Sequence, residues 1–362
     1  MFKNLRSAIM SKRWGWVQDL ESDLHNLRYL FWESTRRCNL SCLHCGSDCG
    51  KDEGQPDLPA DVVLGALSAI AGKYDAGEIM LVVTGGEPLV RPDLFEVLGQ
   101  ARELGFKLGM VTNGYTLTED RARELGEIGL RSIVVSLDGP EENHDWLRNR
   151  PGSFERASRA IVALRAARIP IVEAITCATP RQLDRMDETY DIVRGLGATH
   201  WRVFNIFPKG RARGNADVLL DEDGIRLLVE TMARLRKRGK TESLVVNLSE
   251  EGYLGWDWED QVRDSPYFCR AGINIAGIMV DGAIAACPNL PEWMVQGNLR
   301  DDNFVEVWEQ RYELFRDRSW TQEGACGDCK EWNVCRGNSL HLWDREQKQP
   351  CWCHHQILHP GH

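Results

Sequence analysis

The sequence predicts an α/β protein: a partial, TIM-like (β/α)6 barrel followed by a small Cys-rich C-terminal domain. Three observations predict this fold. Short β-rich runs alternate with amphipathic stretches of helical length, the alternation ends near Gly252, and seven of the 12 cysteines lie from Cys269 onward. Such alternation is typical of parallel strands joined by crossover helices. Six β/α units form either a partial barrel or an open doubly wound sheet.

Strands and helices are expected to alternate over the first two thirds of the chain. The expected strands are 29–35, 78–83, 106–111, 132–137, 169–176 and 199–206. The expected helices are 59–74, 92–104, 118–128, 153–167 and 182–196. We therefore expect four regions: a helical lead-in at 1–28, the barrel at 29–215, a bridging helix and linker at 216–265, and the Cys-rich domain at 266–362. In the lead-in, Trp14 and Trp16 are expected to cover a barrel opening.

Composition and charge exclude several classes of protein. With 362 residues, 43% of them hydrophobic, the chain can bury a full core. Its net charge of −10 and its dispersed basic residues argue against nucleic acid as a partner. No run approaches the roughly 20 apolar residues of a membrane span, and the first 30 residues lack a signal-peptide pattern. We expect a cytoplasmic protein without a membrane partner, in which reduced cysteines bind metal.

The strongest chemical motif is a three-cysteine loop, Cys38-x3-Cys42-x2-Cys45, directly after the first expected strand. Three thiolates on a tight loop can bind three irons of a 4Fe–4S cluster and leave the fourth iron open for another ligand. The alternative is a structural zinc site that uses Cys49 as its fourth ligand. The spacing of these cysteines by itself leaves both possibilities open.

This loop resembles the signature of the radical S-adenosylmethionine (SAM) superfamily. Three further segments, each after an expected strand, resemble other motifs of that family: Gly85-Gly86-Glu87-Pro88, Thr112-Asn113-Gly114 and Ser136-Leu137-Asp138-Gly139. The resemblance implies that the open iron chelates the amino and carboxylate groups of SAM. It also implies that reduction cleaves SAM to a 5′-deoxyadenosyl radical.

The resemblance also implies roles for individual residues. Cys38, Cys42 and Cys45 would bind the cluster, and the implied SAM-binding residues are His44, Gly85, Gly86, Glu87, Pro88, Asn113, Ser136, Asp138 and Arg148. His44 stands where the family has an aromatic residue before the last cysteine. The carboxylate of Glu87 would meet the SAM ammonium group, beside glycines that allow close backbone approach. The guanidinium fork of Arg148 suits a carboxylate, and the alternative is a surface arginine at a helix entry.

The C-terminal cysteines are similar in spacing to the SPASM extension, which carries auxiliary 4Fe–4S clusters. The implied ligands are Cys269, Cys287, Cys326, Cys329, Cys335, Cys351 and Cys353. The usual pattern has one more cysteine at the position of Ser339. Seven cysteines cannot supply the eight ligands of two such clusters. Either one cluster keeps a site without cysteine, or a single cluster forms, as in the shortened twitch version, on Cys269, Cys287, Cys326 and Cys329. Zinc remains the alternative for the spacing of Cys326, Cys329 and Cys335.

The resemblance implies hydrogen-atom abstraction from a substrate. The leading substrate class is a peptide or protein side chain, with epimerisation, crosslinking or oxidation as the outcome. The runner-up is a dehydrogenase or epimerase of a sugar-like or aminocyclitol molecule, and a third possibility is a non-catalytic electron carrier. The implied partner is an electron donor such as flavodoxin or ferredoxin. Residues 43–49 and 268–274 also resemble a subfamily usually encoded beside small lipoproteins.

Cys177 belongs to neither group of cysteines. It follows the β-rich run 171–176, so we expect it at the C-terminal end of the fifth strand, where barrels bind their ligands. Free cysteines are among the most buried residues, so an inert core position is one interpretation. The other is that Cys177 is catalytic and donates a hydrogen atom to a substrate radical, as a cysteine does in radical SAM epimerases.

Overall fold

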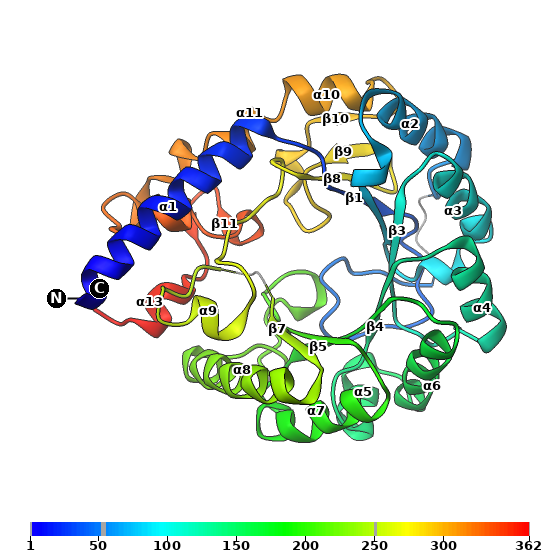
Figure 1. Ribbon diagram of the computed structural model, residues 1–362, viewed down its shortest axis with the longest axis horizontal. Helices are drawn as coiled ribbons and strands as arrows, with labels where there is room; N and C mark the ends of the chain where they lie inside the picture. The colour runs from blue at the N-terminus through cyan, green and yellow to red at the C-terminus, as the bar shows by residue number, and fades with distance from the viewer. Residues whose placement is uncertain (1, 52–55, 250–251, 362) are drawn as a thin grey trace.

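A single curved sheet organises the computed structural model, which describes residues 2–51, 56–249 and 252–361 (Figure 1). Its strand order is β10-β9-β8-β1-β2-β3-β4-β5-β6-β7. The six expected strands are present as β1 Tyr29–Glu33, β2 Met80–Thr84, β3 Lys107–Thr112, β4 Ser132–Ser136, β5 Ile171–Ala178 and β6 His200–Asn205. Neighbouring strands from β1 to β6 run parallel, so their C-terminal ends meet at one edge.

Helices cover the outer face of this sheet (Figure 1). They are α2 Ala60–Lys73, α3 Leu94–Glu103, α4 Glu119–Ile128, α5 Glu141–Arg148, α6 Ser153–Ala166, α7 Met186–Gly195 and α8 Glu222–Glu242. The sequence pattern did not predict α5, because this short helix follows Pro140 and only two of its eight residues, Trp146 and Leu147, are apolar. The expected helix 182–196 is instead a short 3-10 turn, Leu183–Arg185, followed by α7. The mixed α/β fold with a parallel sheet is confirmed.

The sheet extends beyond the six expected strands at both ends. β7, Val245–Leu248, pairs with β6, and β8, Ile275–Ile278, pairs with the other side of β1. Both pairings are parallel, and antiparallel β9 Ala283–Ala285 and β10 Gly297–Asn298 follow β8. Strands of four or fewer residues carry too little alternation to be predicted from sequence. Consequently, the first strands of the Cys-rich region continue the barrel sheet.

Alternation along each strand divides side chains between the helix layer and the barrel interior. In β5, Val172, Ala174 and Ala178 are buried in the main core with the helices. Glu173, Ile175 and Cys177 take the opposite parity and are partly exposed. Cys177 therefore faces the barrel interior, near the C-terminal end of its strand.

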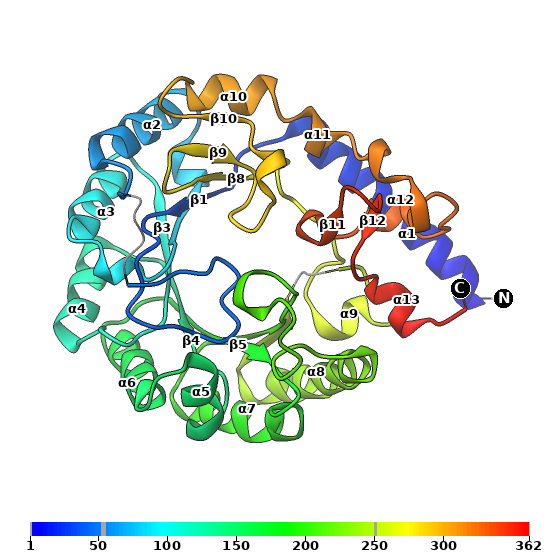
Figure 2. The same cartoon turned by 180° about the vertical axis from the view of Figure 1, so that it is seen from behind.

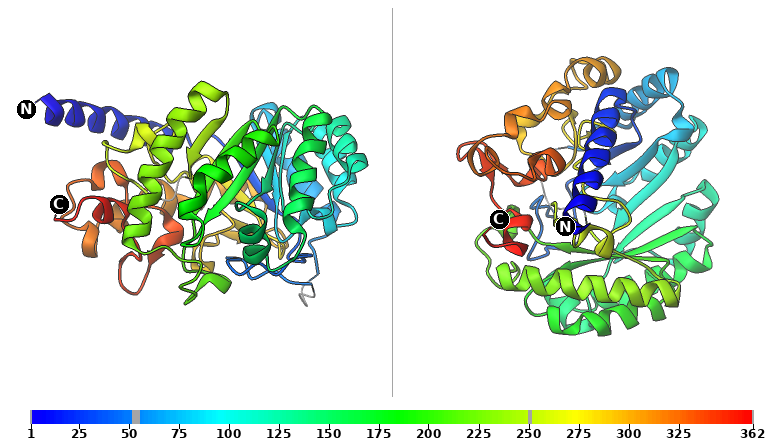
Figure 3. Two further views of the ribbon diagram at one scale, coloured as in Figure 1. Left: turned by 90° about the horizontal axis from the view of Figure 1, so that it is seen from below. Right: turned by 60° about the vertical axis from the view of Figure 1, so that its left-hand side comes forward.

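The helix α1, Phe2–Leu24, lies along the Cys-rich region (Figures 1 and 3). Its Trp14 donates a hydrogen bond from Nε1 to the Tyr267 carbonyl at 3.2 Å, and Gln18 donates to the Val334 carbonyl at 2.7 Å. Trp16 is 67% exposed. The expectation that both tryptophans cover a barrel opening is wrong, because the apolar partners of α1 lie in the C-terminal region.

Short elements build the remainder of that region and run down the open side of the sheet (Figure 2). They are α9 Glu259–Val262, α10 Phe304–Gln310, α11 Glu313–Arg316, α12 Trp332–Cys335, β11 Trp343–Asp344, β12 Gln349–Pro350 and α13 His354–Leu358. Loops therefore position most of the C-terminal cysteines. Within the described part of the chain, no helix is long and apolar enough to cross a bilayer.

Candidate active site and iron–sulfur sites

The three-cysteine loop lies at the C-terminal edge of the sheet, directly after β1. Its ends are tied together, because the Cys38 N–H donates to the Gly50 carbonyl at 2.7 Å. The Leu43 N–H donates to the Leu147 carbonyl at 2.9 Å, which fixes the middle of the loop on α5. Cys42 is buried, and Cys38 and Cys45 are partly exposed. The loop is therefore held in place by the fold while two of its thiols remain accessible.

The two glycines after β2 pack directly against the start of this loop. Gly85 has a φ of +137°, and a Cβ there would lie 2.2 Å from the Thr35 carbonyl oxygen. A Cβ on Gly86 would lie 2.3 Å from the Arg37 carbonyl oxygen. The N–H groups of Gly86 and Glu87 donate to these same two carbonyls, at 2.7 and 3.0 Å. Glycine is needed here because backbone meets backbone without room for a side chain.

Glu87, which precedes the buried Pro88, is itself completely buried and joins the ends of β2 and β3. Its carboxylate accepts hydrogen bonds from the Leu89 N–H at 3.2 Å, the Thr112 hydroxyl at 2.7 Å and the Asn113 N–H at 2.7 Å. Burial raises the pKa of Glu87, and these donors oppose the rise. A carboxylate has about four acceptor sites. Three donors therefore leave one of these acceptor sites without a donor among the described residues.

Asn113 connects the end of β3 to the cysteine loop. Its side-chain amide donates to Asn39 Oδ1 at 2.7 Å and lies 3.8 Å from the sulfur of Cys38. The Cys38 sulfur also accepts the Leu40 N–H at 3.5 Å. The segment predicted as a family motif thus reaches the first cysteine of the loop.

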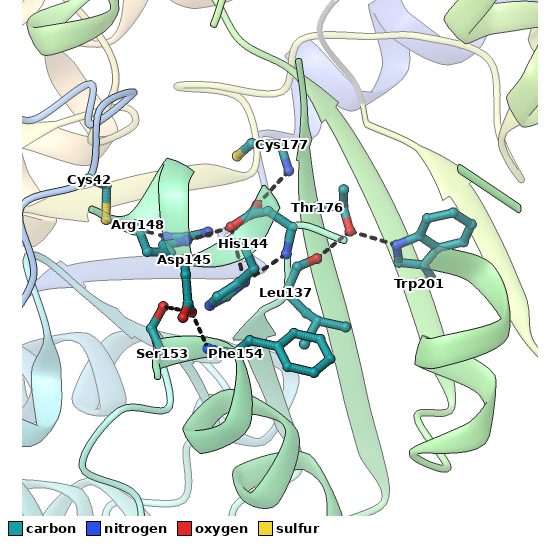
Figure 4. Close-up of polar contacts among 11 residues, drawn as sticks. Cys42, Leu137, His144, Asp145, Arg148, Ser153, Phe154, Thr176, Cys177 and Trp201 are labelled. Carbon is teal, nitrogen blue, oxygen red and sulfur yellow. Dashed lines mark hydrogen bonds and ion pairs between the residues drawn. The ribbon is translucent and has the colours of Figure 1, made fainter. Parts of the chain in front are cut away.

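A buried ion pair connects the end of β4 to the second cysteine (Figure 4). Arg148 donates from Nε to Asp138 Oδ2 at 2.5 Å, and its Nη1 lies 3.8 Å from the sulfur of Cys42. Burial alone would raise the pKa of Asp138, but Arg148, His144 and His44 overcome it and leave the pKa below its usual value. The interpretation of Arg148 as a surface residue is wrong, because its side chain is buried against Asp138.

His144 and Asp145 keep Arg148 in position. Burial lowers the pKa of His144 to about 4, so the ring is neutral near pH 7 and its Nδ1 accepts the Asp138 N–H at 3.0 Å. Asp145 binds the start of α6 through the Ser153 hydroxyl at 2.9 Å and the Phe154 N–H at 2.8 Å (Figure 4). The middle of α5 is thereby fixed both to the segment after β4 and to the start of α6.

Two polar atoms beside the loop suit the bound cofactor. His44 Nδ1 and Asn39 Nδ2 are buried, and neither has a hydrogen-bond partner among the described residues. Burial lowers the pKa of His44 to about 3, which makes the ring neutral. Unpaired buried polar atoms are costly unless a ligand satisfies them. Together with the remaining acceptor of Glu87, they fit a polar molecule such as SAM above the cysteine loop.

The thiols of the loop differ in their electrostatics. A hydrogen bond from the Cys49 side chain is the largest reason that the pKa of Cys45 falls to about 5. Burial raises the pKa of Cys38 to about 11 and also raises that of Cys42, although Arg148 opposes this rise. Across the described chain, no three Cys, His, Asp or Glu side chains converge on the position of one metal ion. The ligands of a four-iron cluster lie farther apart, because each binds a different iron.

Two other sequence-predicted residues lie on neighbouring strand ends. Ser136 is the last residue of β4 and is nearly buried. The Cys177 N–H donates to Asp138 Oδ1 at 2.9 Å. Its side chain contacts an apolar cluster formed by Leu147, Ile206, Ala212 and Val218. Cys177 is thus beside the Asp138–Arg148 pair, on the same barrel edge as the cysteine loop.

Five C-terminal cysteines line a cavity of about 420 Å³: Cys326, Cys329, Cys335, Cys351 and Cys353. Burial, together with the neighbouring charges of Cys353 and Cys329, raises the pKa of Cys326 to about 11. Burial also raises the pKa of Cys335, and the charges of Cys353, Cys326 and Cys329 contribute to this rise. Cys351 is exposed, and its charged neighbour is Asp344 rather than another thiol. Cys326, Cys329, Cys335 and Cys353 therefore lie close together, whereas Cys269 and Cys287, which the twitch alternative would join to Cys326 and Cys329, do not line this cavity.

Cys269 and Cys287 form a separate pair. Burial raises the pKa of Cys287 to about 11, and Cys269 and Lys209 are among its charged neighbours. Ser339, which stands where the SPASM pattern has a cysteine, shares a hydrogen bond of 2.7 Å with the Tyr267 hydroxyl. The pair therefore lacks the thiol that the usual pattern would add.

Sequence reasoning missed Arg211, which follows β6. Its side chain donates to the carbonyl oxygens of Cys42 and Cys49, at 2.7 and 2.9 Å. The only signal in the sequence was its place just after an expected strand, at the same edge as the other motifs.

Comparison with known families agrees with this geometry. Residues 32–193 match the model of the radical SAM superfamily, and residues 269–330 match that of an iron–sulfur cluster-binding domain, SPASM. The chain belongs to the radical SAM superfamily, within its SPASM-containing enzymes. Its radical SAM domain binds a 4Fe–4S cluster and SAM, and its SPASM domain is an auxiliary iron–sulfur cluster-binding domain.

Particular relatives extend over most of the chain. An AdoMet-dependent heme synthase of Oleidesulfovibrio alaskensis is 30% identical over 342 residues, which cover 88% of this chain and 84% of that protein. The mycofactocin maturase MftC of Mycobacterium tuberculosis is 30% identical over 330 residues, with coverage of 90% and 81%.

Solved structures share the fold. Streptococcus suis SuiB bound to S-adenosylmethionine has a TM-score of 0.71 at 18% identity and covers 92% of this chain and 77% of its own. The enzyme anSMEcpe with bound AdoMet and a peptide has the same TM-score and identity and covers 92% and 94%.

Proposed function

We propose that this enzyme abstracts a hydrogen atom from a peptide or protein side chain. The observation that supports this most is that segments after β2, β3 and β4 all reach the cysteine loop after β1. Gly86 contacts its start, Asn113 contacts Cys38, and Arg148 connects Asp138 to Cys42. A structural metal loop would not need polar groups from three other strand ends.

The residues around the loop divide into ligands and orienting groups. Cys38, Cys42 and Cys45 are the proposed ligands of the radical cluster. The remaining acceptor site of Glu87 would take the SAM ammonium group, and His44 would contact another polar part of SAM. When bound, the cluster and SAM supply a 5′-deoxyadenosyl radical, and the auxiliary cluster supplies an electron acceptor. Arg148 orients its neighbours because its guanidinium is fixed by Asp138.

The proposed ligands of the auxiliary cluster are Cys326, Cys329, Cys335 and Cys353. Four thiols complete the coordination of four irons, so this cluster would bind no substrate directly. A closed cluster of this kind suits electron transfer. We therefore favour a net oxidation or crosslink, unless Cys177 returns a hydrogen atom.

Two arginines near the site are already paired with carboxylates, which favours a peptide over a substrate with many carboxylates. Arg148 binds Asp138, and Arg211 binds Asp48. Solved proteins of this fold are described with bound peptides, SuiB with its precursor peptide SuiA and anSMEcpe with Cp18Cys. The second candidate is a tetrapyrrole, favoured by the similarity to the AdoMet-dependent heme synthases.

The test is substrate-dependent formation of 5′-deoxyadenosine. Anaerobically reconstituted enzyme is mixed with SAM, dithionite and one of three additions: a small peptide encoded beside its gene, Fe-coproporphyrin III, or no substrate. We expect the peptide to stimulate 5′-deoxyadenosine formation and to change in mass. Stimulation by the porphyrin alone would overturn the peptide proposal. Cys42→Ala, which should form no 5′-deoxyadenosine, is the control for the cluster ligands.

A further inference from the structure

The segment after β6 also contacts the cysteine loop. Arg211 makes four contacts with the loop, one from its backbone and three from its side chain. Its N–H donates to the Cys45 carbonyl at 3.0 Å, and its Nε donates to the Cys42 carbonyl at 2.7 Å. Its Nη1 donates to the Cys49 carbonyl at 2.9 Å and to Asp48 Oδ1 at 2.7 Å. One residue thus binds the carbonyls of two proposed ligands.

Gly210 brings the two backbones together. Its φ is +54°, and a Cβ there would lie 2.3 Å from the Cys45 carbonyl oxygen and 2.5 Å from that of Gly46. These are backbone atoms, so they cannot move aside as the end of a flexible side chain can. The approach of the segment therefore depends on the absence of a side chain at this position.

The segment is itself anchored on both sides of the site. Lys209 donates from Nζ to the Asn289 carbonyl at 2.7 Å, beside Cys287. The ring of Phe207 lies 4.4 Å from that of His341, centroid to centroid. Ala212 is completely buried in the apolar cluster with Leu147 and Ile206. The segment therefore connects the C-terminal region to the cysteine loop, so the position of one depends on the other.

We propose that residues 209–211 form a clasp that fixes the radical-cluster loop, with Arg211 as its positioning residue. The proposal rests on the ligand roles of Cys42 and Cys45 proposed above. The planar guanidinium suits this task because it donates in fixed directions to several acceptors at once. Its contacts with carbonyls matter more than its pair with Asp48, because that carboxylate is 65% exposed.

The clasp also places a permanent positive charge beside the loop. The potential of an iron–sulfur cluster depends on nearby charge and hydrogen bonding. A positive charge stabilises the more negative, reduced state. Removal of Arg211 should therefore lower the reduction potential of the radical cluster, whereas a purely structural loss would change its occupancy alone.

The chain offers matched controls for both residues. Arg213→Ala removes an exposed arginine two residues farther along. Gly214→Ala places a side chain at a φ of +75° with no other atom within 4 Å, so it tests the cost of that conformation without the clash. Arg211→Lys keeps the charge and removes the fork.

The experiment measures the cluster whose EPR signal changes when SAM is added to the reduced, full-length protein. We expect Arg211→Ala to release this iron to a chelator on the order of tenfold faster than wild type, as loss of a charge-assisted hydrogen bond implies. Gly210→Ala should also release it faster, because its Cβ would clash with the Cys45 and Gly46 carbonyls. Arg211→Ala should also lower its potential, while Arg211→Lys should release iron faster at a nearly unchanged potential. Both controls should behave as wild type.

Two results would overturn parts of the proposal separately. If Arg211→Ala matched Arg213→Ala in iron release and potential, the clasp would have no positioning role. If Cys42→Ala kept the SAM-responsive signal, the ligand assignment itself would be wrong. Should Gly210→Ala fail to fold, the two Arg211 variants still decide the question.

Discussion

Arg148 and Asp138 form an ion pair of 2.5 Å in which both side chains are almost completely removed from solvent. The pair lies between the sulfur of Cys42 and the backbone of Cys177. It therefore connects two cysteines to which the sequence assigned different roles. Because the pair is buried, changing one partner should have a large effect on the stability of the site.

Asp138→Asn should destabilise the apo-protein substantially. Breaking a buried pair leaves an uncompensated charge, and the expected loss in the free energy of unfolding is about 3–5 kcal/mol. Urea unfolding followed by circular dichroism measures it. The control is Glu142→Gln, which removes an exposed partner of Arg185 and should leave the unfolding midpoint unchanged. Equal midpoints for the two variants would show that the buried pair contributes nothing.

Cys45 should be the most reactive thiol of its loop in the apo-protein. Its pKa of about 5 makes it a thiolate at pH 7, whereas the pKa of Cys38, about 11, keeps that residue a thiol. Iodoacetamide at pH 7 should therefore label Cys45 first, and the rate should fall as the pH drops through 5. Peptide mass mapping measures the order.

Cys49→Ala provides the control for this reactivity. It removes the hydrogen bond that lowers the pKa of Cys45, so labelling at pH 6 should slow. The same variant should keep reductive SAM cleavage, because Cys49 is not a proposed ligand. Faster labelling of Cys38 than of Cys45 would contradict the assigned pKa order.

Cys353 and Cys351 should differ in their effect on the auxiliary cluster. A variant with Cys38, Cys42 and Cys45 changed to Ala should still bind about four irons and four sulfides per chain, with an EPR signal after reduction. Adding Cys353→Ala should abolish that iron, and adding Cys351→Ala should not. About eight irons would indicate a second cluster on Cys269 and Cys287, whereas zinc would exclude a redox role.

Cys177 should determine whether the product gains a hydrogen from solvent. If its thiol donates a hydrogen atom, wild type in D2O should place one deuterium in the product, and Cys177→Ala should place none while still cleaving SAM. Mass and chiral analysis of the product measure this. An unchanged product from Cys177→Ala would show that Cys177 only packs beside Leu147, and it would favour oxidation or crosslinking.

The sequence predicted well where a motif follows a long strand. Parallel pairing makes strand ends meet, so the three-cysteine loop, Glu87, Asn113 and Asp138 could be expected at one edge from strand order alone. The sequence was a poorer guide to the C-terminal cysteines, which lie mostly in loops. The four grouped C-terminal cysteines come from turns whose approach no periodicity encodes, so the sequence could not decide between the twitch set and two clusters.

Residues that bind backbone carbonyl groups also could not be predicted from the sequence. Arg211 binds backbone oxygens, and any residue type can present a backbone oxygen, so no partner motif marked it. The prediction for Trp14 was wrong for a related reason, because its partner, Tyr267, is more than 250 positions away in sequence. Long-range packing of this kind depends on the assembled sheet.

The position of β1 has a consequence for how the chain reaches its native state. Tyr29 pairs with Met80 on one side and with Ile275 on the other. During synthesis, β1 can gain its first neighbour early, but its second edge stays bare until the ribosome has produced β8. An unpaired strand edge is a template for aggregation, and contacts so distant in sequence form slowly. A chain truncated before β8 should therefore aggregate in the cell, so expression of the barrel alone is a poor route to the isolated domain.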